Sequence, residues 1–268
     1  MYLRHLLLIV SLIVLSSCNP DIKVIKGHAH NDYVNENPLH DALDNGFISV
    51  EADVHLVDDQ LYVSHDLPEE LDPALTLETL YLDPLKEHIE KNNGFVYRRY
   101  SGPFYLMIDF KSSAKPSYDK LKKILQNYLS IISVVENGIA RKGAVTILIS
   151  GNRPVGAVLN DNPKLAGLDG RPFNLGQNIP ASIMPVISDD FSYFLSWKAN
   201  GEINEDQYKK LKGLVQNTHD QNKELRLWGT PDNEHVWRFL LDNGVDLINT
   251  DNIEAFREFM LIYDPSSN

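Results

Sequence analysis

The stretch from Gly27 to Asp66 decides how this chain folds, and it contains three short motifs. They read GHAHNDY at 27–33, SVEADV at 49–54 and VSHD at 63–66. Each motif places histidine or carboxylate side chains where a short apolar strand would end. Imidazoles move protons near neutral pH, and carboxylates hold divalent cations. The pattern therefore suits a metal-assisted attack on a phosphodiester.

Outward from these motifs, short apolar runs alternate with helical patterns. Strands are predicted at 24–26 leading to His28, and at 47–54, 104–110, 145–149, 165–168, 183–187, 225–228 and 245–249, with a hairpin partner at 61–64. Helices are predicted at 38–45, 118–132, 204–221, 234–243 and 253–263, with Asn204 and Asn233 as caps.

Eight strands with helical connections predict an α/β fold, a (β/α)8 TIM barrel, in preference to a doubly wound open sheet. No linker divides 18–268, so this range is expected to be one domain. The segments around 67–100 and 151–182 are expected to be irregular loops that shape the barrel mouth.

The N-terminus has the composition of an export signal. An apolar run from Leu6 to Leu15 follows Arg4, and it is too short for a comfortable membrane span. Leu15-Ser16-Ser17-Cys18 resembles the lipobox of bacterial lipoproteins. The resemblance implies a signal peptide over 1–17, lipid attachment at Cys18 and export to the periplasmic or outer-membrane face of the cell envelope. The alternative is an ordinary signal peptide with a chance cysteine.

Charge and cysteine content restrict the possible functions further. The chain has 37 acidic and 25 basic residues, a formal charge of −12, and its lysines and arginines are scattered. No basic stripe is visible, which argues against a nucleic-acid partner. The single cysteine excludes an internal disulfide framework.

Polar side chains at the predicted strand ends are the candidate site. The carboxyl ends of barrel strands gather at one rim, where chemistry collects. Glu51, Asp53 and Asp109 would form a hard oxygen site for Ca²⁺ or Mg²⁺. His30 is open to three interpretations: metal ligand, second proton carrier or spacer. The other strand ends offer Lys111, Ser150, Asn152, Arg153, Asp169, Arg171, Ser188, Asp189, Asp190, Trp228, Asn249 and Asp251.

Together these residues resemble the glycerophosphodiester phosphodiesterase and phosphatidylinositol-specific phospholipase C superfamily over 24–260. The matching elements are His28, Glu51-Ala52-Asp53, His65-Asp66, Asp109-Phe110-Lys111, Trp228 and Gly244–Asp251. The commonest pattern has His-Arg-Gly at the first strand, where this chain has His28-Ala29-His30-Asn31-Asp32-Tyr33. This His-Asn-Asp-Tyr form is similar to a lesser-known branch of the same superfamily. A phosphate-contacting arginine is therefore missing there, and Arg153 or Lys111 are candidates to replace its charge.

The resemblance implies a phosphoric diester hydrolase acting on a small phosphodiester or a lipid head group, with His28 and His65 as general base and general acid. Glu51, Asp53 and Asp109 would hold Ca²⁺ or Mg²⁺, while Lys111, Arg153 and Trp228 would contact the substrate. A substrate hydroxyl would attack first and give a cyclic phosphate. Two alternatives remain: a lipid-anchored module that binds a phosphorylated ligand without turnover, and a metal-dependent sugar or amide hydrolase, whose sites usually hold more histidines.

Overall fold

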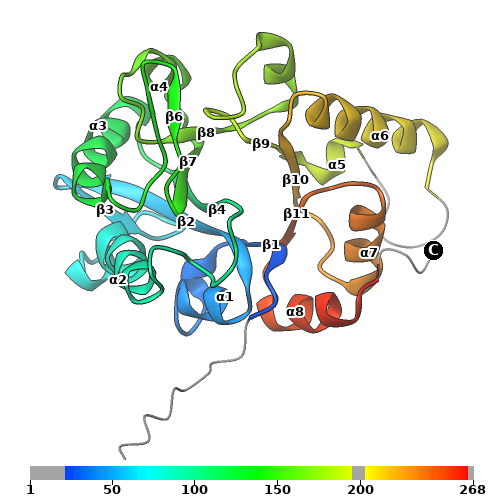
Figure 1. The fold of residues 1–268 in the computed structure, drawn as a ribbon, viewed down its shortest axis with the longest axis horizontal. Coiled ribbons are helices and arrows are strands. Elements are labelled where there is room, and N and C mark those ends of the chain that lie inside the picture. Colours follow the sequence, from blue (N-terminus) through cyan, green and yellow to red (C-terminus); the bar gives the residue numbers. More distant parts are fainter. Residues whose placement is uncertain (1–21, 195–202, 265–268) are drawn as a thin grey trace, which may run out of the picture.

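The computed structural model describes residues 22–194 and 203–264. The predicted signal peptide at 1–17 and the lipidation site Cys18 lie outside these residues. Within them, eight parallel strands close into a barrel with helices around the outside (Figure 1). The predicted TIM-barrel fold is therefore confirmed.

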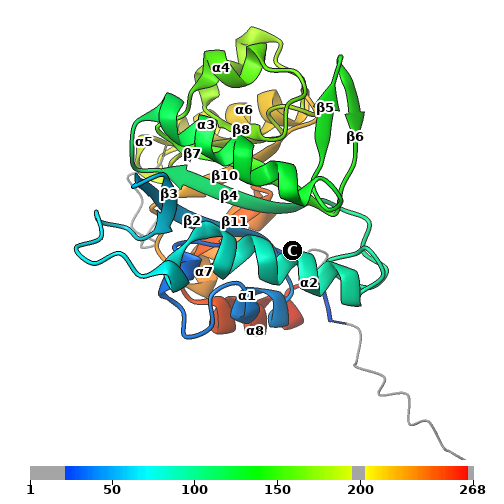
Figure 2. The same cartoon turned by 90° about the vertical axis from the view of Figure 1, so that its left-hand side faces the viewer.

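The barrel strands follow one another around the ring in chain order. They are β1 (Ile25–Ala29), β2 (Phe47–Val57), β4 (Phe104–Phe110), β7 (Val145–Gly151), β8 (Gly167–Gly170), β9 (Val186–Asp190), β10 (Glu224–Trp228) and β11 (Leu247–Thr250). Pairing of β1 with both β2 and β11 closes the ring. A short strand β3 (Gln60–Val63) adds antiparallel to β2, and β5 (Val134–Glu136) with β6 (Ile139–Arg141) forms a separate hairpin at the opposite side of the molecule (Figure 2).

The helices pack around the ring of strands. They are α1 (His40–Asp44), α2 (Asp83–Lys91), α3 (Ala114–Leu125), α4 (Val155–Asn160), α5 (Phe191–Phe194), α6 (Glu205–His219), α7 (Glu234–Asp242) and α8 (Ile253–Ile262). The predicted caps are confirmed, since the side chains of Asn204 and Asn233 accept backbone N–H groups at the starts of α6 and α7.

The alternation of side chains along β2 and β4 explains how the site is positioned. In a strand, successive side chains point to opposite faces. Ile48, Val50 and Ala52 therefore share one apolar face with the core packed beneath the helices, whereas Ser49, Glu51 and Asp53 share the other face. Burying that second row leaves polar groups inside a closed barrel, where each needs a partner.

Several predicted bounds differ from the structure, and two segments show a physical reason. Strand β9 begins at Val186 rather than Ile183, because Pro185 has no N–H to donate and the Ile183 carbonyl instead accepts from Leu168. The 67–100 segment was expected to be irregular, but it contains a π-helical turn (Glu78–Leu82) leading into α2. Leu82, Leu85 and Ile89 lie buried on one helical face there.

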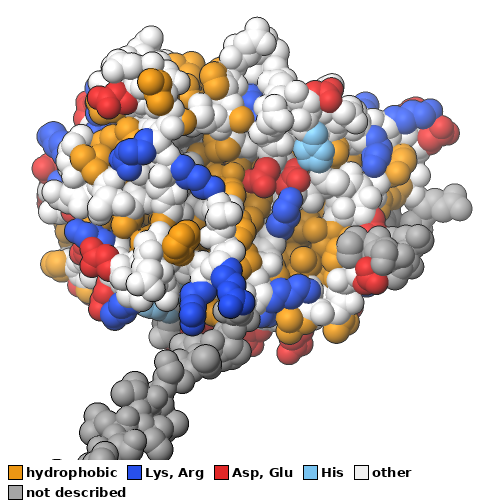
Figure 3. Space-filling view, in the orientation of Figure 1, with side chains coloured by type: hydrophobic (Ala, Val, Ile, Leu, Met, Phe, Trp, Pro, Cys, Tyr) orange, Lys and Arg blue, Asp and Glu red, His pale blue; other side chains and the backbone are white. Residues whose placement is uncertain are grey.

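Acidic, basic and apolar side chains are intermingled on the face of the molecule seen in Figure 3. None of the helices in the described residues is both long and apolar enough to span a bilayer.

Candidate active site

Three carboxylates converge at the carboxyl ends of β2 and β4. Asp53 pairs directly with Asp109 in the parallel register, and Glu51 lies one inward-facing position earlier on β2. One oxygen from each of Glu51, Asp53 and Asp109 lies within 4.8 Å of the others. Burial and the charges of Glu51 and Asp53 raise the pKa of Asp109, although Lys111 partly offsets them. The cluster therefore concentrates negative charge that a cation would neutralise.

The hydrogen bonds of Asp53 occupy only one of its oxygens. Oδ2 lies 2.9 Å from the Tyr33 hydroxyl, 3.0 Å from Nδ1 of His65 and 3.0 Å from Nζ of Lys111. Oδ1 is buried without any hydrogen-bond partner in the described structure. Buried polar atoms are rarely left unpaired, and a carboxylate oxygen among two further carboxylates fits a divalent cation. The residues present therefore suit the Ca²⁺ or Mg²⁺ expected from the sequence.

Lys111 supplies the positive charge next to this cluster. Its ammonium group lies 3.0 Å from Asp53 Oδ2 and 3.2 Å from Asp109 Oδ1. Burial works to lower the pKa of Lys111, but the two carboxylates outweigh it and raise that pKa. Lys111 thus stays charged at the rim beside the carboxylates.

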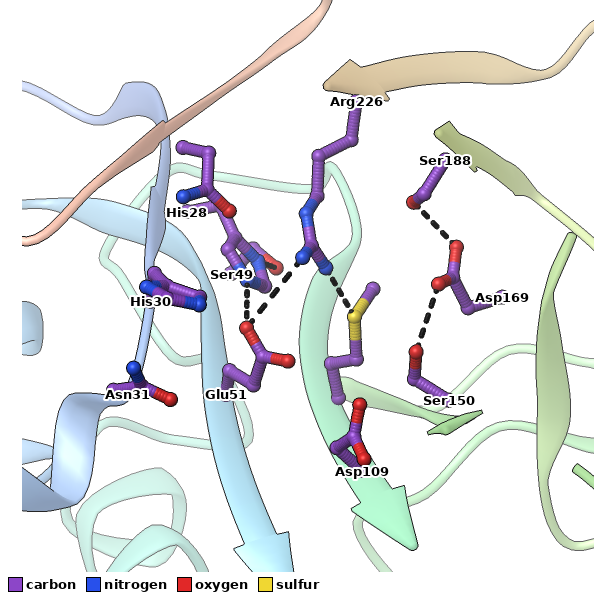
Figure 4. A network of polar contacts seen from close by, with 12 residues as sticks. His28, His30, Asn31, Ser49, Glu51, Asp109, Ser150, Asp169, Ser188 and Arg226 are labelled. Carbon is purple, nitrogen blue, oxygen red and sulfur yellow. Dashed lines mark hydrogen bonds and ion pairs between the residues drawn. The ribbon is translucent and has the colours of Figure 1, made fainter. Parts of the chain in front are cut away.

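Glu51 is held from inside the barrel by His28 and Arg226, and His28 is held in turn by Ser49. Nε2 of His28 lies 2.9 Å from Glu51 Oε2, and Nδ1 of His28 lies 2.7 Å from the Ser49 hydroxyl. Nη2 of the buried Arg226 approaches the same Oε2 at 3.5 Å. Figure 4 shows these groups together, with Arg226 between Glu51 and the opposite wall. Burial alone would raise the pKa of Glu51, but Arg226 and the His28 hydrogen bond hold it well below its usual range.

His28 occupies a position unlike that of a proton carrier. Its side chain is 0% exposed and both ring nitrogens are hydrogen-bonded. Burial, helped by the charge of Arg226, lowers the pKa of His28 to about 4, so the ring is neutral near pH 7. Because a carboxylate only accepts, Nε2 carries the proton and Nδ1 accepts from Ser49.

Two other imidazoles lie at the rim and are open to solvent. His30 is 30% exposed, and its Nδ1 lies 2.7 Å from Asp251 Oδ1. His65 is 64% exposed, and its Nδ1 lies 3.0 Å from Asp53 Oδ2. A carboxylate on Nδ1 holds the proton there and leaves Nε2 available for exchange with another group. His30, which the sequence left open, thus has the accessibility that His28 lacks.

The opposite half of the barrel forms a second polar network. Asp169 is fully buried rather than at the rim, because β8 extends to Gly170. Its carboxylate accepts from Ser150, Ser188 and Arg171. Arg153 donates to the Asp169 backbone carbonyl, and Arg171 covers the ring of Trp228 with its guanidinium 4.6 Å from the ring centroid. Arg153 and Trp228 therefore belong to this network, and in the described part of the chain no hydrogen bond or ion pair joins them to the acidic cluster.

Ser49, Tyr33 and Arg226 are the contributors that sequence reasoning missed. Ser49 lies an even number of residues from Glu51 and Asp53, and Arg226 lies two residues before Trp228. Strand alternation therefore placed Ser49 and Arg226 on the same strand faces as those predicted site residues. Tyr33 lies in the short helical turn Asp32–Val34 after β1, and only the fold brings its hydroxyl to Asp53.

Comparison with known proteins places this chain in a family. The family model of the AIM6-like phosphodiesterase domain matches residues 16–165. The chain belongs to the AIM6-like phosphodiesterase family. A relative of this family from Eremothecium gossypii, altered inheritance of mitochondria protein 6, is 30% identical over 89% of this chain and 70% of its own length. A homologue of that protein from Arthroderma benhamiae is 29% identical over 87% of this chain and 82% of its own length.

Solved structures similar to this AIM6-like chain share its fold. A glycerophosphodiester phosphodiesterase from Parabacteroides distasonis superposes with a TM-score of 0.51 at 16% identity, covering 89% of this chain and 96% of that one. A phosphodiesterase from Oleispira antarctica, solved with the product sn-glycerol-3-phosphate, superposes with a TM-score of 0.51 at 12% identity, covering 88% and 97%. The AIM6-like chain therefore has the barrel of glycerophosphodiester phosphodiesterases.

Proposed function

We propose that this chain is a metal-dependent phosphoric diester hydrolase acting on a glycerophosphodiester- or phosphoinositide-like substrate. The observation that carries the proposal is the convergence of Glu51, Asp53 and Asp109, with one buried oxygen of Asp53 left unpaired. These three carboxylates would hold Ca²⁺ or Mg²⁺. When bound, such a cation polarises a phosphoryl oxygen and favours attack on phosphorus.

His30 and His65 are the proposed proton-transfer pair. Both are exposed at the rim, and both have Nδ1 held by a carboxylate so that Nε2 faces other partners. One imidazole takes the proton of the attacking hydroxyl, and the other gives a proton to the leaving alcohol oxygen. This assignment replaces the role predicted for His28, whose two nitrogens are already occupied inside the barrel.

Cationic groups at the rim support binding of an anionic substrate. Lys111 lies beside the carboxylates and is the proposed contact for charge that builds on the phosphate. Arg153 is the proposed second phosphate contact, with Trp228 beside the alcohol portion of the substrate. The arginine of the commonest family pattern is missing from the segment His28–Tyr33, so the substrate need not be glycerophosphodiester itself.

The experiment is an activity screen with the purified chain. Glycerophosphodiesters, phosphoinositides and bis(p-nitrophenyl) phosphate are supplied with EDTA, and then with Ca²⁺ or Mg²⁺ restored. We expect turnover of at least one diester that EDTA abolishes and the cation restores, with Asp53→Asn as the inactive control. Activity in none of these conditions would favour a phospho-ligand-binding module without turnover.

Lipid attachment at Cys18 and export to the cell envelope stay predictions from the sequence. The relatives named above are fungal proteins, which gives no support to attachment of the bacterial type. Radiolabelled fatty acid fed to expressing cells should label the wild-type chain and leave a Cys18→Ser variant unlabelled. Equal labelling of the two would remove the prediction.

A further inference from the structure

The motif Asn31-Asp32-Tyr33 connects the loop after β1 to a carboxylate of the site. The Tyr33 hydroxyl lies 2.9 Å from Asp53 Oδ2 and 3.0 Å from Asn31 Oδ1. Asn31 itself adopts a left-handed conformation with φ 48°, which turns the chain sharply as it leaves the strand. The phenol is therefore brought back over the strand ends.

Asp32 anchors this loop in the protein core. Its side chain is 0% exposed, and Oδ2 accepts the Leu39 N–H at 2.5 Å and the Tyr81 hydroxyl at 3.0 Å. Tyr81 is also fully buried, in the π-helical turn before α2. A buried carboxylate with two donors on Oδ2, and Asn35 Nδ2 3.4 Å from Oδ1, fixes the loop between positions 32 and 39 more firmly than surface contacts would.

The consequence appears at Asp53. The three contacts of this carboxylate, from Tyr33, His65 and Lys111, all go to Oδ2, and Oδ1 remains unpaired and buried. His65 is largely exposed, and the Lys111 ammonium is shared with Asp109. Tyr33 is the partner of Oδ2 whose loop is anchored in the core through Asp32.

We propose that Asn31-Asp32-Tyr33 is a clamp that orients Asp53: Asp32 anchors the loop, and the Tyr33 hydroxyl binds Oδ2 so that Oδ1 faces the cation site. The proposal rests on the proposed function, because it takes Asp53 as a cation ligand. Tyr33 is thus a positioning residue that acts through Asp53. Partners that orient a ligating carboxylate commonly contribute 10- to 100-fold in metal affinity.

The test is calorimetric titration of the whole chain with Ca²⁺ and with Mg²⁺, without substrate. Tyr33→Phe removes only the hydroxyl and should weaken cation binding at least ~10-fold. Tyr62→Phe is the matched control, because Tyr62 is buried on β3 and no hydrogen bond of its hydroxyl occurs in the described residues. Urea unfolding in EDTA verifies that both variants remain folded.

Tyr81→Phe extends the test to the anchor. It should weaken cation binding in the same direction but less than Tyr33→Phe, because the loss reaches Asp53 only through the loop. Added to Tyr33→Phe, the Tyr81→Phe substitution should lower cation affinity almost no further, because Tyr81 acts on Asp53 through Tyr33. Fully additive losses would contradict a common route through Tyr33.

The outcomes separate this proposal from the proposed function. A wild-type chain that binds neither cation would overturn the cation site, and the clamp with it. Tight cation binding by both the wild type and Tyr33→Phe would overturn the clamp alone. An unchanged affinity for the cation with a raised KM for the diester would assign Tyr33 to substrate contact and overturn the clamp as well.

Discussion

Nδ1 of His30 lies 2.7 Å from Oδ1 of Asp251, and this contact joins the residues that follow the first and the last strand of the barrel. The backbone N–H groups of Asp251 and Asn252 both donate to Asp232, so the turn that carries Asp251 is held in place. An imidazole whose Nδ1–H faces a carboxylate presents Nε2 as a base. The closure of the barrel thus fixes the proposed proton-transfer group His30 at its rim.

His30→Ala should lower kcat by at least ~10²-fold, because a positioned acid–base group contributes about that much. Cation affinity should change little, since His30 is hydrogen-bonded to Asp251 and not to a carboxylate of the cluster. Steady-state kinetics at saturating cation, with calorimetry alongside, measure both quantities. Retained turnover in His30→Ala would exclude the assignment, and His65→Ala should lower kcat to a similar extent.

His28→Ala should instead weaken cation binding by about 10- to 100-fold, because His28 orients Glu51. His28→Gln should recover part of the affinity, since its amide donates from near the position of Nε2. Raising the cation concentration should restore much of the turnover of His28→Ala. A ~10²-fold loss of kcat with undiminished affinity would instead make His28 a proton carrier.

Gly151→Ala should disrupt the cation site through Asp109. Gly151 has φ +61°, and a Cβ built on it would overlap Oδ1 of Asp109 and the Phe110 carbonyl. The carboxylate would have to move, so we expect weaker cation binding together with some loss of stability. Gly156→Ala in α4 is the control, because nothing lies within 4 Å of its added Cβ. Equal cation affinity of the two variants would contradict the expected displacement.

Asp32→Asn should change how stability depends on pH. Burial raises the pKa of Asp32 to about 6, from an ordinary value near 4. The folded state therefore binds this proton more tightly than the unfolded state, and the associated stability is lost as pH rises through about 6.

The wild type should lose about 2 kcal/mol of stability relative to Asp32→Asn between pH 4 and pH 7. Urea unfolding in EDTA across this range measures the difference. The buried His28 titrates in both proteins, so its contribution cancels in the comparison. Parallel stability curves for the two proteins would show that Asp32 titrates normally.

The strand alternation of Glu51 and Asp53, and the position of Asp109 on the next barrel strand, were sufficient to predict the carboxylate cluster. Residues two apart share a strand face, and carboxyl ends of parallel strands meet at one rim. The same logic could not predict Tyr33 or Arg226 as partners of these carboxylates, because they come from a loop and from a strand 175 positions after Glu51.

The order of residues by itself determined the barrel, the inward row Ser49, Glu51 and Asp53, and the presence of two imidazoles at 28 and 30. It could not distinguish the depths of those imidazoles, since both face the same way. The depth of each imidazole is decided by the closed ring of strands. His28 pairs in register with Ser49 on β2 and Asn249 on β11, so it is enclosed. His30 lies beyond the end of β1 and reaches solvent. Depth in a barrel depends on the stagger of adjacent strands, which is a property of their pairing and not of either strand alone.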